Sequence, residues 1–356
     1  MDETAKALLR VIPGLRVVVD DGTTAPHAII QDYLKQQPVA TEHWVAPLLF
    51  ISDPSVELSE VVESISLAIE DGEVEIPMEI QSTIAAIDAS AMMSILSQPK
   101  PLVELGRQLD EFDDLTNADL VVEQIETADV VVLARSQGLE SDLKDKVWNV
   151  IEWLSPRAQI LPLEDISENT QFPNFDLEAM LMGAGWLQLI AGTHPQPNRG
   201  VGLTGFAFRA RRPFHPARFL EVLEYLSSQN VIRARGLIWV ATRNDEAGHL
   251  LQAGGAALMA NSGAWWAATP MKEWPDDPME RDEIMADWIP PYGDRQQEFA
   301  VIGLDLQELE IRRQLKRALL TDEEFEQGPA VWNQWEDPLP DWNPIADDED
   351  PDPFLN

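Results

Sequence analysis

The residues of this chain best suited to recognition are arginines and tryptophans in its C-terminal part. A guanidinium group binds carboxylates through paired hydrogen bonds, and an indole ring either packs in a core or stacks on a ligand. Together they form a candidate interaction surface for a carboxylate-rich protein partner. The set comprises Arg211, Arg212, His215, Arg233, Arg235, Trp239, Trp265, Trp266 and Arg295.

Alternation along a strand predicts that two of these arginines share a face. Arg233 and Arg235 are separated by one residue, so in a β-strand they project to the same side. The chain also supplies abundant carboxylates, which favours internal ion pairs over an external ligand. For the tryptophans, core or interdomain packing is the favoured alternative to a ligand cage.

Histidine and cysteine usage gives little support for a metal or catalytic centre. The chain has five histidines and no cysteine, so neither a disulfide nor a thiolate metal site can form. No two histidines have the spacing of a zinc-binding pair. His215 precedes Pro216 at an expected helix start, which indicates a helix-entry residue packed beside Phe214. A transient ligand role for His215 is the alternative. We predict no catalytic and no metal-binding residue.

The charge balance restricts the class of partner. The formal net charge is -37, and no basic residue follows Arg317. Direct nucleic-acid binding is disfavoured because phosphates require a basic surface. The acidity suits a basic protein partner, or serves solubility alone. No apolar run of about 18 residues occurs, and the N-terminus does not resemble a signal peptide, so we expect no membrane contact and a cytoplasmic protein.

Strand-like and helical segments alternate in the first half of the chain. A helix is expected over 4–11, and short apolar strands over 15–19, 47–51, 83–87 and 130–133. This order predicts an α/β domain with a mainly parallel sheet. Asp53 follows the second strand, where a carboxylate could approach magnesium, although an Asp before Pro more often serves a turn or cap.

The second half has a different order of elements. Strands are expected over 203–209, 231–242 and 298–303, with helices from Pro216 and over 306–319. Strands flanked by helices without strict alternation predict an α+β domain. A polar loop at 193–200 marks the boundary. The expected domains are therefore 1–192, 201–325 and an acidic tail, 326–356, with little core of its own.

Four ordered segments carry a family resemblance. They read FRARRPFHP (208–216), RARGLIW (233–239), GAWW (263–266) and DRQQEFAVIG (294–303). This set resembles the C-terminal domain of the CobW family, GTPases linked to metal delivery. Weaker similarity extends over most of 83–325. The resemblance implies a P-loop GTPase-like parallel-sheet domain followed by a CobW C-terminal domain, with GTP and zinc as the family's ligands.

The motifs that would bind those ligands are absent. No G-x-x-x-x-G-K-[ST] phosphate loop occurs, and the family register places that loop upstream of Met1. The guanine-reading Asn-Lys-x-Asp positions hold Ala134, Arg135, Ser136 and Gln137. Without the Asp carboxylate we expect guanine selectivity to be lost. The family's cysteine element, expected near Glu42 to Val45, is also missing, so the G domain is predicted to be degenerate.

Two functional hypotheses remain. The acidic, tryptophan-bearing insert (274–288) and the tail segment (332–338) resemble an actinobacterial branch of the family. That branch includes a factor that recruits a hibernation factor to ribosomes during zinc limitation. The first hypothesis is therefore a non-catalytic adaptor whose partner is a hibernation factor or a ribosomal protein. The alternative is a zinc metallochaperone GTPase whose P-loop lies outside this chain.

Overall fold

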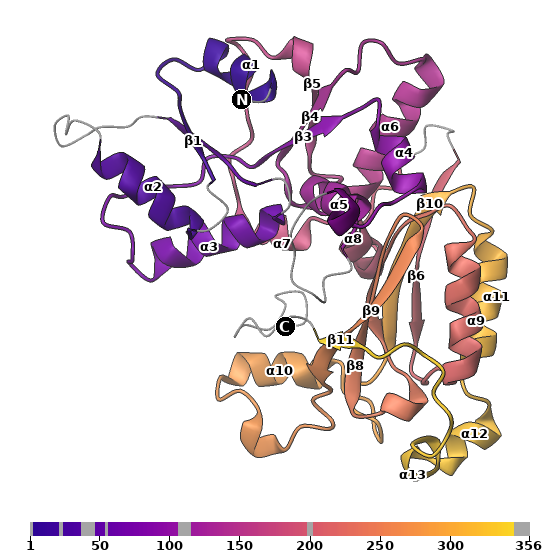
Figure 1. Ribbon diagram of the computed structural model, residues 1–356. Helices are drawn as coiled ribbons and strands as arrows, with labels where there is room; N and C mark the ends of the chain where they lie inside the picture. The colour runs from indigo at the N-terminus through magenta and orange to yellow at the C-terminus, as the bar shows by residue number, and fades with distance from the viewer. Residues whose placement is uncertain are drawn as a thin grey trace. The chain divides into compact units, whose positions relative to one another are not determined.

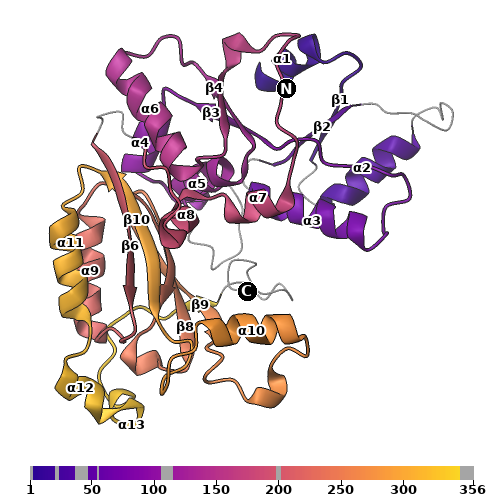
Figure 2. The same cartoon turned by 180° about the vertical axis from the view of Figure 1, so that it is seen from behind.

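The computed structural model describes residues 3–20, 24–36, 47–53, 56–105, 115–197 and 202–344. The chain divides into two compact units (Figures 1 and 2). The first comprises residues 1–95 and 99–185, and the second comprises 96–98 and everything from Trp186 onward. This division falls ahead of the 193–200 loop, and it includes the described part of the tail in the second unit.

The first unit contains parallel strands and covering helices. β1 (Arg16–Val19) pairs with β2 (Leu48–Ile51), and β4 (Val130–Ala134) lies between β3 (Ile84–Asp88) and β5 (Gln159–Pro162). Apart from Ala134, β4 is entirely buried, as expected for a central parallel strand covered on both faces. The helices are α1 (Glu3–Val11), α2 (Pro26–Lys35), α3 (Leu58–Glu70), α4 (Met92–Ser97), α5 (Asn117–Thr127), α6 (Ser141–Leu154) and α7 (Leu177–Met182).

The strands of the first unit form two separate sheets. Among the described residues, β2 pairs only with β1, and β3 pairs only with β4. The helix layer connects the two sheets, because the buried carboxylate of Glu123 on α5 accepts the amides of Leu58 and Ser59 at the start of α3, at 2.9 and 2.8 Å. The expected parallel sheet is therefore present as two parts, and within the described residues β1, β2, β3 and β5 each pair on one edge alone.

The second unit is built on a six-stranded sheet in the order β11-β9-β8-β7-β10-β6. All neighbours are antiparallel except β11 and β9. The expected strand over 231–242 ends at Ile238, because the chain turns into a short 3₁₀ segment at Ala241–Arg243. The strands are β6 (Leu203–Ala210), β7 (Val231–Ile238), β8 (Glu246–Ala253), β9 (Ala256–Ala264), β10 (Gln297–Leu304) and β11 (Asn343–Pro344).

Two helices cover one face of this sheet. α9 (Pro216–Ser227) and α11 (Glu308–Ala318) lie side by side along it (Figure 1). Five buried phenylalanines lie in the core, two from β6 and one each from β10, α9 and the turn before α9. Among them, the rings of Phe214 and Phe219 stack with centroids 4.4 Å apart. The remaining helices are α8 (Gly185–Ala191), α10 (Pro278–Ala286), α12 (Asp322–Gln327) and α13 (Pro329–Trp332). No described helix is long and apolar enough to cross a membrane.

Candidate functional site

The arginine-rich signature lies against the segment that follows α11. The amide of His215 donates to the carbonyl of Ala318 at 2.8 Å, and the amide of Leu320 donates to the carbonyl of Pro213 at 3.0 Å. Phe214 lies between them and forms isolated bridges with Val240 and Leu319. The signature therefore connects the end of β7 to the end of α11 through main-chain hydrogen bonds.

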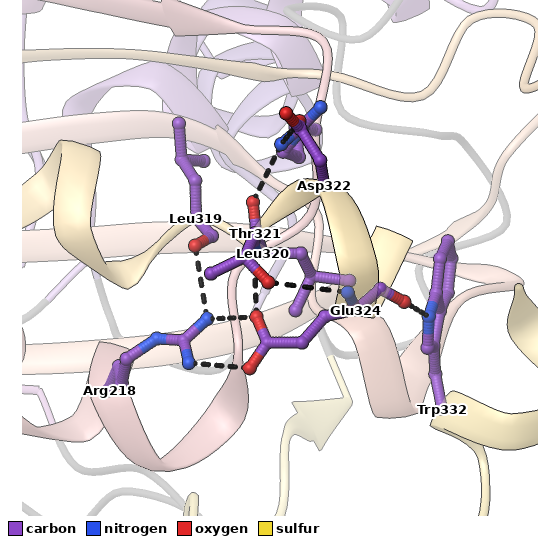
Figure 3. Close-up of polar contacts among 8 residues, drawn as sticks. Arg218, Leu319, Leu320, Thr321, Asp322, Glu324 and Trp332 are labelled. Atoms are coloured by element: carbon purple, nitrogen blue, oxygen red, sulfur yellow. Dashed lines mark hydrogen bonds and ion pairs between the residues drawn. The ribbon is translucent and has the colours of Figure 1, made fainter. Parts of the chain in front are cut away.

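A bidentate ion pair fixes this connection (Figure 3). Arg218 donates to both carboxylate oxygens of Glu324, at 2.8 and 2.7 Å, and also to the carbonyl of Leu319 at 3.0 Å. The same carboxylate accepts the amide of Thr321 at 2.8 Å and completes the capping box of α12. The Arg218 hydrogen bonds outweigh the opposing effect of burial and, together with the Thr321 amide, lower the pKa of Glu324 to about 2.

Other arginines also bind carboxylates and carbonyls of this chain's own C-terminal part. Arg212 donates to the carbonyl of Leu320 at 2.9 Å, pairs with Asp322 at 2.7 Å and lies 4.8 Å from the ring centre of Phe325. Arg243 pairs with Asp337 at 2.9 Å and lies over the ring of Trp342. The acceptors of Arg212 and Arg243 thus lie within this chain. Internal pairing of this kind is the alternative that the chain's excess of carboxylates favoured over an external ligand.

The tryptophans of the signature pack inside the second unit. Trp239 is fully buried, and its Nε1 donates to Asn244 at 3.2 Å. Its ring lies edge-on to that of Trp332, whose Nε1 donates to the carbonyl of Glu324 at 2.7 Å. Trp265 belongs to the same cluster and is 4% exposed. The tail residue Trp332 is thus part of this core.

Four residues of the candidate interaction surface are buried, and their assignment to a surface is wrong. Spacing identifies which side chains share a strand face but not what covers that face. Arg295 shows the consequence: its guanidinium donates to the carbonyl of Asn244 at 2.6 Å and to Asp245 at 3.0 Å. The buried four are Arg233, Trp239, Trp265 and Arg295.

The arginine pair on β7 shares one face, as alternation predicts. Arg235 lies over the ring of Trp186 at 5.2 Å. The neighbouring strand presents His249 to the same face. Burial, and then the charges of Arg235 and Arg233, hold the pKa of His249 well below its ordinary value. Both guanidiniums therefore lie near a buried imidazole, and that of Arg235 also lies over an indole ring.

His215 occupies the helix entry, as predicted. It precedes α9 at the N-cap position, and its ring stacks on Trp335 with centroids 5.1 Å apart. Burial is the main cause that lowers the pKa of His215, and Arg218 adds to it against the opposing charge of Glu324. Of the remaining candidates, Arg211 pairs with Asp287 at 3.3 Å, and the half-buried Trp266 packs edge-on against Trp274.

The positions of the guanine-reading motif follow β4 in the first unit. Arg135 has a left-handed backbone (φ 58°), and its guanidinium donates to Oδ2 of Asp88 at the end of β3, at 2.6 Å. The other oxygen of Asp88 accepts the amide and hydroxyl of Ser90. Burial alone would raise the pKa of Asp88, but the Ser90 and Arg135 hydrogen bonds lower it. This ion pair borders a cavity of about 350 Å³ that also touches Glu3 and Thr4 of α1.

The other proposed ligand positions have structural contacts. Asp53, at the end of β2, accepts the amide of Val56 through its carbonyl, and its own amide donates to Asp20. This is the turn geometry that the sequence favoured. Within the described ranges, no three His, Cys, Asp or Glu side chains are grouped to hold a metal ion. The segment around Glu42 to Val45 lies outside the described residues.

Comparison with known proteins places this fold in a family. Residues 203–319 match the cobalamin synthesis protein cobW C-terminal domain. A zinc chaperone of Mycobacterium tuberculosis is 30% identical over 294 residues, which are 79% of this chain and 67% of that protein. The chain belongs to the CobW family. The zinc-regulated GTPase metalloprotein activator 1 of Dictyostelium discoideum is 28% identical over 73% of this chain, which spans 56% of that relative's length.

The CobW C-terminal domain accounts for most of the second unit's core. Its matched residues run from the start of β6 to the residue after α11 and include the whole antiparallel part of the sheet. The expectation of an α/β protein with a CobW C-terminal domain is therefore confirmed. The Zn(II)-bound YjiA GTPase of E. coli aligns over 86% of this chain and 98% of its own, with 11% identity and a TM-score of 0.31.

The Arg218–Glu324 pair predicts a pH-dependent contribution to stability. We expect Glu324→Gln to lower the free energy of unfolding by about 1–2 kcal/mol at neutral pH, since both side chains are partly exposed. The carboxylate has a folded pKa of about 2 against an ordinary 4.5. The wild-type advantage is therefore complete above pH 4.5 and diminishes as the pH falls towards 2. Urea unfolding across this range measures it.

Glu323→Gln is the matched control. Glu323 is the exposed neighbour on the same helix, so its substitution should change the free energy of unfolding by less than about 0.5 kcal/mol. An equal effect of both substitutions, or a Glu324→Gln effect that does not change with pH, would contradict the assigned role of the pair.

Proposed function

We propose that this CobW-family protein is a cytoplasmic, non-catalytic adaptor in zinc homeostasis that acts without reading guanine nucleotides. The observation that supports this most directly is the ion pair between Arg135 and Asp88. It connects the ends of β3 and β4 at the position of the family's base-reading motif.

The chemistry at this position does not suit a guanine base. A base-reading carboxylate must accept two hydrogen bonds, whereas the motif's acidic position holds the neutral amide Gln137. The nearby carboxylate of Asp88 already accepts from Arg135 and from Ser90. The residues present at this position therefore do not fit a guanine base.

A protein partner is the remaining basis for a function. The net charge of -37 would steer a basic protein to this chain and repel nucleic acid. Relatives named for zinc delivery and zinc regulation support a place in zinc homeostasis. The resemblance of the insert and tail to the recruiting branch of the family points to a hibernation factor or a ribosomal protein as the partner.

Affinity capture from zinc-limited cells tests the adaptor proposal. We expect the tagged protein to retain a hibernation factor or a ribosomal subunit after zinc depletion, in equal amounts with GDP and with a non-hydrolysable GTP analogue. Mass spectrometry with isotope-labelled references measures the ratio of the amounts retained with the two nucleotides. Recovery of neither component, or recovery that requires the GTP analogue, would contradict the proposal.

The divided sheet supports a second candidate function. The open edges of β2 and β3 could accept one further parallel strand, and α1 and the cavity beside Asp88 lie in the same unit. A strand and phosphate loop supplied from outside this chain would convert this unit into a P-loop domain. The protein would then be a zinc metallochaperone GTPase with altered base selectivity.

Restoring the base-reading motif, in the chain joined to such a strand and phosphate loop, distinguishes the two candidates. The substitutions Ala134→Asn, Arg135→Lys and Gln137→Asp replace the guanidinium that pairs with Asp88 and supply the missing carboxylate. For an adaptor, we expect no saturable binding of fluorescent GTP by either the wild type or the triple variant. For a GTPase, the triple variant should bind GTP at least about tenfold more tightly than the wild type and prefer it over ATP.

A further inference from the structure

An acidic arm with exposed methionines extends from the second unit between β9 and β10. The arm comprises residues 271–289 and includes α10 (Figure 1). No residue of α10 is buried. A helix with no buried face gains no stability from a core, so its position must be set by its ends or by a partner.

Both ends of the arm are fixed to the second unit. Trp274 is 9% exposed, and its Nε1 donates to the carbonyl of Thr269 at 3.1 Å. Trp288 packs against Trp274 with ring centroids 5.4 Å apart, and Asp287 pairs with Arg211. Asp277 caps the start of α10 by accepting the amide of Met279 at 2.9 Å. The arm is thus held in place while its middle is left uncovered.

The uncovered part presents apolar side chains to solvent. The exposed fractions are 75% for Met271, 73% for Met279, 51% for Met285 and 50% for Ile289. Methionine is flexible and polarisable, and it is frequent on surfaces that bind amphipathic segments of varied sequence. Four large apolar side chains on one short arm are more than the scattered exposure expected of an ordinary surface.

Charge restricts what can cover these side chains. The arm carries seven carboxylates against two cations, Lys272 and Arg281. Lys272 pairs with Glu273, and Arg281 pairs with Asp276 and donates to the carbonyl of Pro275. The tail after Arg317, a second copy of this chain, nucleic acid and an anionic membrane all share the arm's negative sign. Only a basic occupant complements it.

We propose that the arm docks a basic amphipathic segment of a partner protein. The methionines and Ile289 contact the apolar side of that segment, and the surrounding carboxylates pair with its lysines and arginines. This inference rests on the proposed adaptor function and names the surface through which the adaptor holds its partner.

A defined peptide tests the docking surface. The probe is a synthetic amphipathic helix of lysine and leucine, compared with a scrambled peptide of the same composition. Fluorescence anisotropy at physiological salt should show that the full-length protein binds the amphipathic peptide at least about tenfold more tightly. Equal binding of the two peptides would mean attraction by charge alone and would overturn the proposal.

Two variants locate the binding. Met279→Ser, Met285→Ser and Ile289→Ser together should weaken peptide binding about tenfold or more. The matched control combines Leu67→Ser, Met182→Ser and Leu309→Ser, three exposed apolar side chains outside the arm, and should leave binding within about twofold of the wild type. Equal affinities for the two variants would overturn the proposal.

Cross-linking tests the docking site even if the triple variant fails to fold. A photoreactive side chain at Met279 should capture the peptide, whereas one at Leu309 should not. Capture at Leu309 alone would overturn the docking site.

Affinity capture from cell extracts distinguishes a failure of the docking site from a failure of the adaptor function. If the wild-type protein fails to retain ribosomal components, the adaptor function is contradicted. Their undiminished retention by the arm variant contradicts only the arm as the docking site.

Discussion

The arrangement of the second unit depends on the bidentate pairing of Arg218 with Glu324. The Glu324 side chain performs two tasks, because it accepts both arms of the guanidinium and caps α12 through the amide of Thr321. The carbonyl of the same residue accepts Nε1 of Trp332, and Trp332 packs against Trp239. One residue thus connects the start of α9, the start of α12 and an aromatic core that the tail completes. Arg218 and the signature residue Arg212 both bind acceptors within the second unit.

Local sequence patterns predicted many of the individual elements. The helix at 4–11, the strands at 15–19 and 130–133 and the helix from Pro216 all form close to their expected bounds, because apolar spacing and proline act within a few residues. Pairing between strands is not local. The sequence therefore did not reveal that the first unit has two sheets, or that the strand expected over 231–242 ends at Ile238.

The candidate site was predictable to a similar extent. Spacing correctly placed Arg233 and Arg235 on one face and His215 at a helix entry, but it could not show that Arg233 and Arg295 are buried. Arg218 and its partner Glu324 were missed because they are separated by about a hundred residues. The available signal was Thr321 followed three residues later by Glu324, which is the pattern of a capping box. The pairing of Arg135 with Asp88 had no sequence signal of its own.

Together, these features assign the stabilising contacts of the second unit and the proposed partner-binding surface to different residues. Arg212, Arg218 and Arg243 hold the C-terminal domain and the described tail together, while the methionines of the arm are exposed. A double-mutant cycle of Arg218→Met and Glu324→Gln, measured by urea unfolding of the full-length protein, tests this structural role most directly. We predict a coupling free energy of about 1–2 kcal/mol between the two positions. Additive effects, with coupling below about 0.3 kcal/mol, would contradict it.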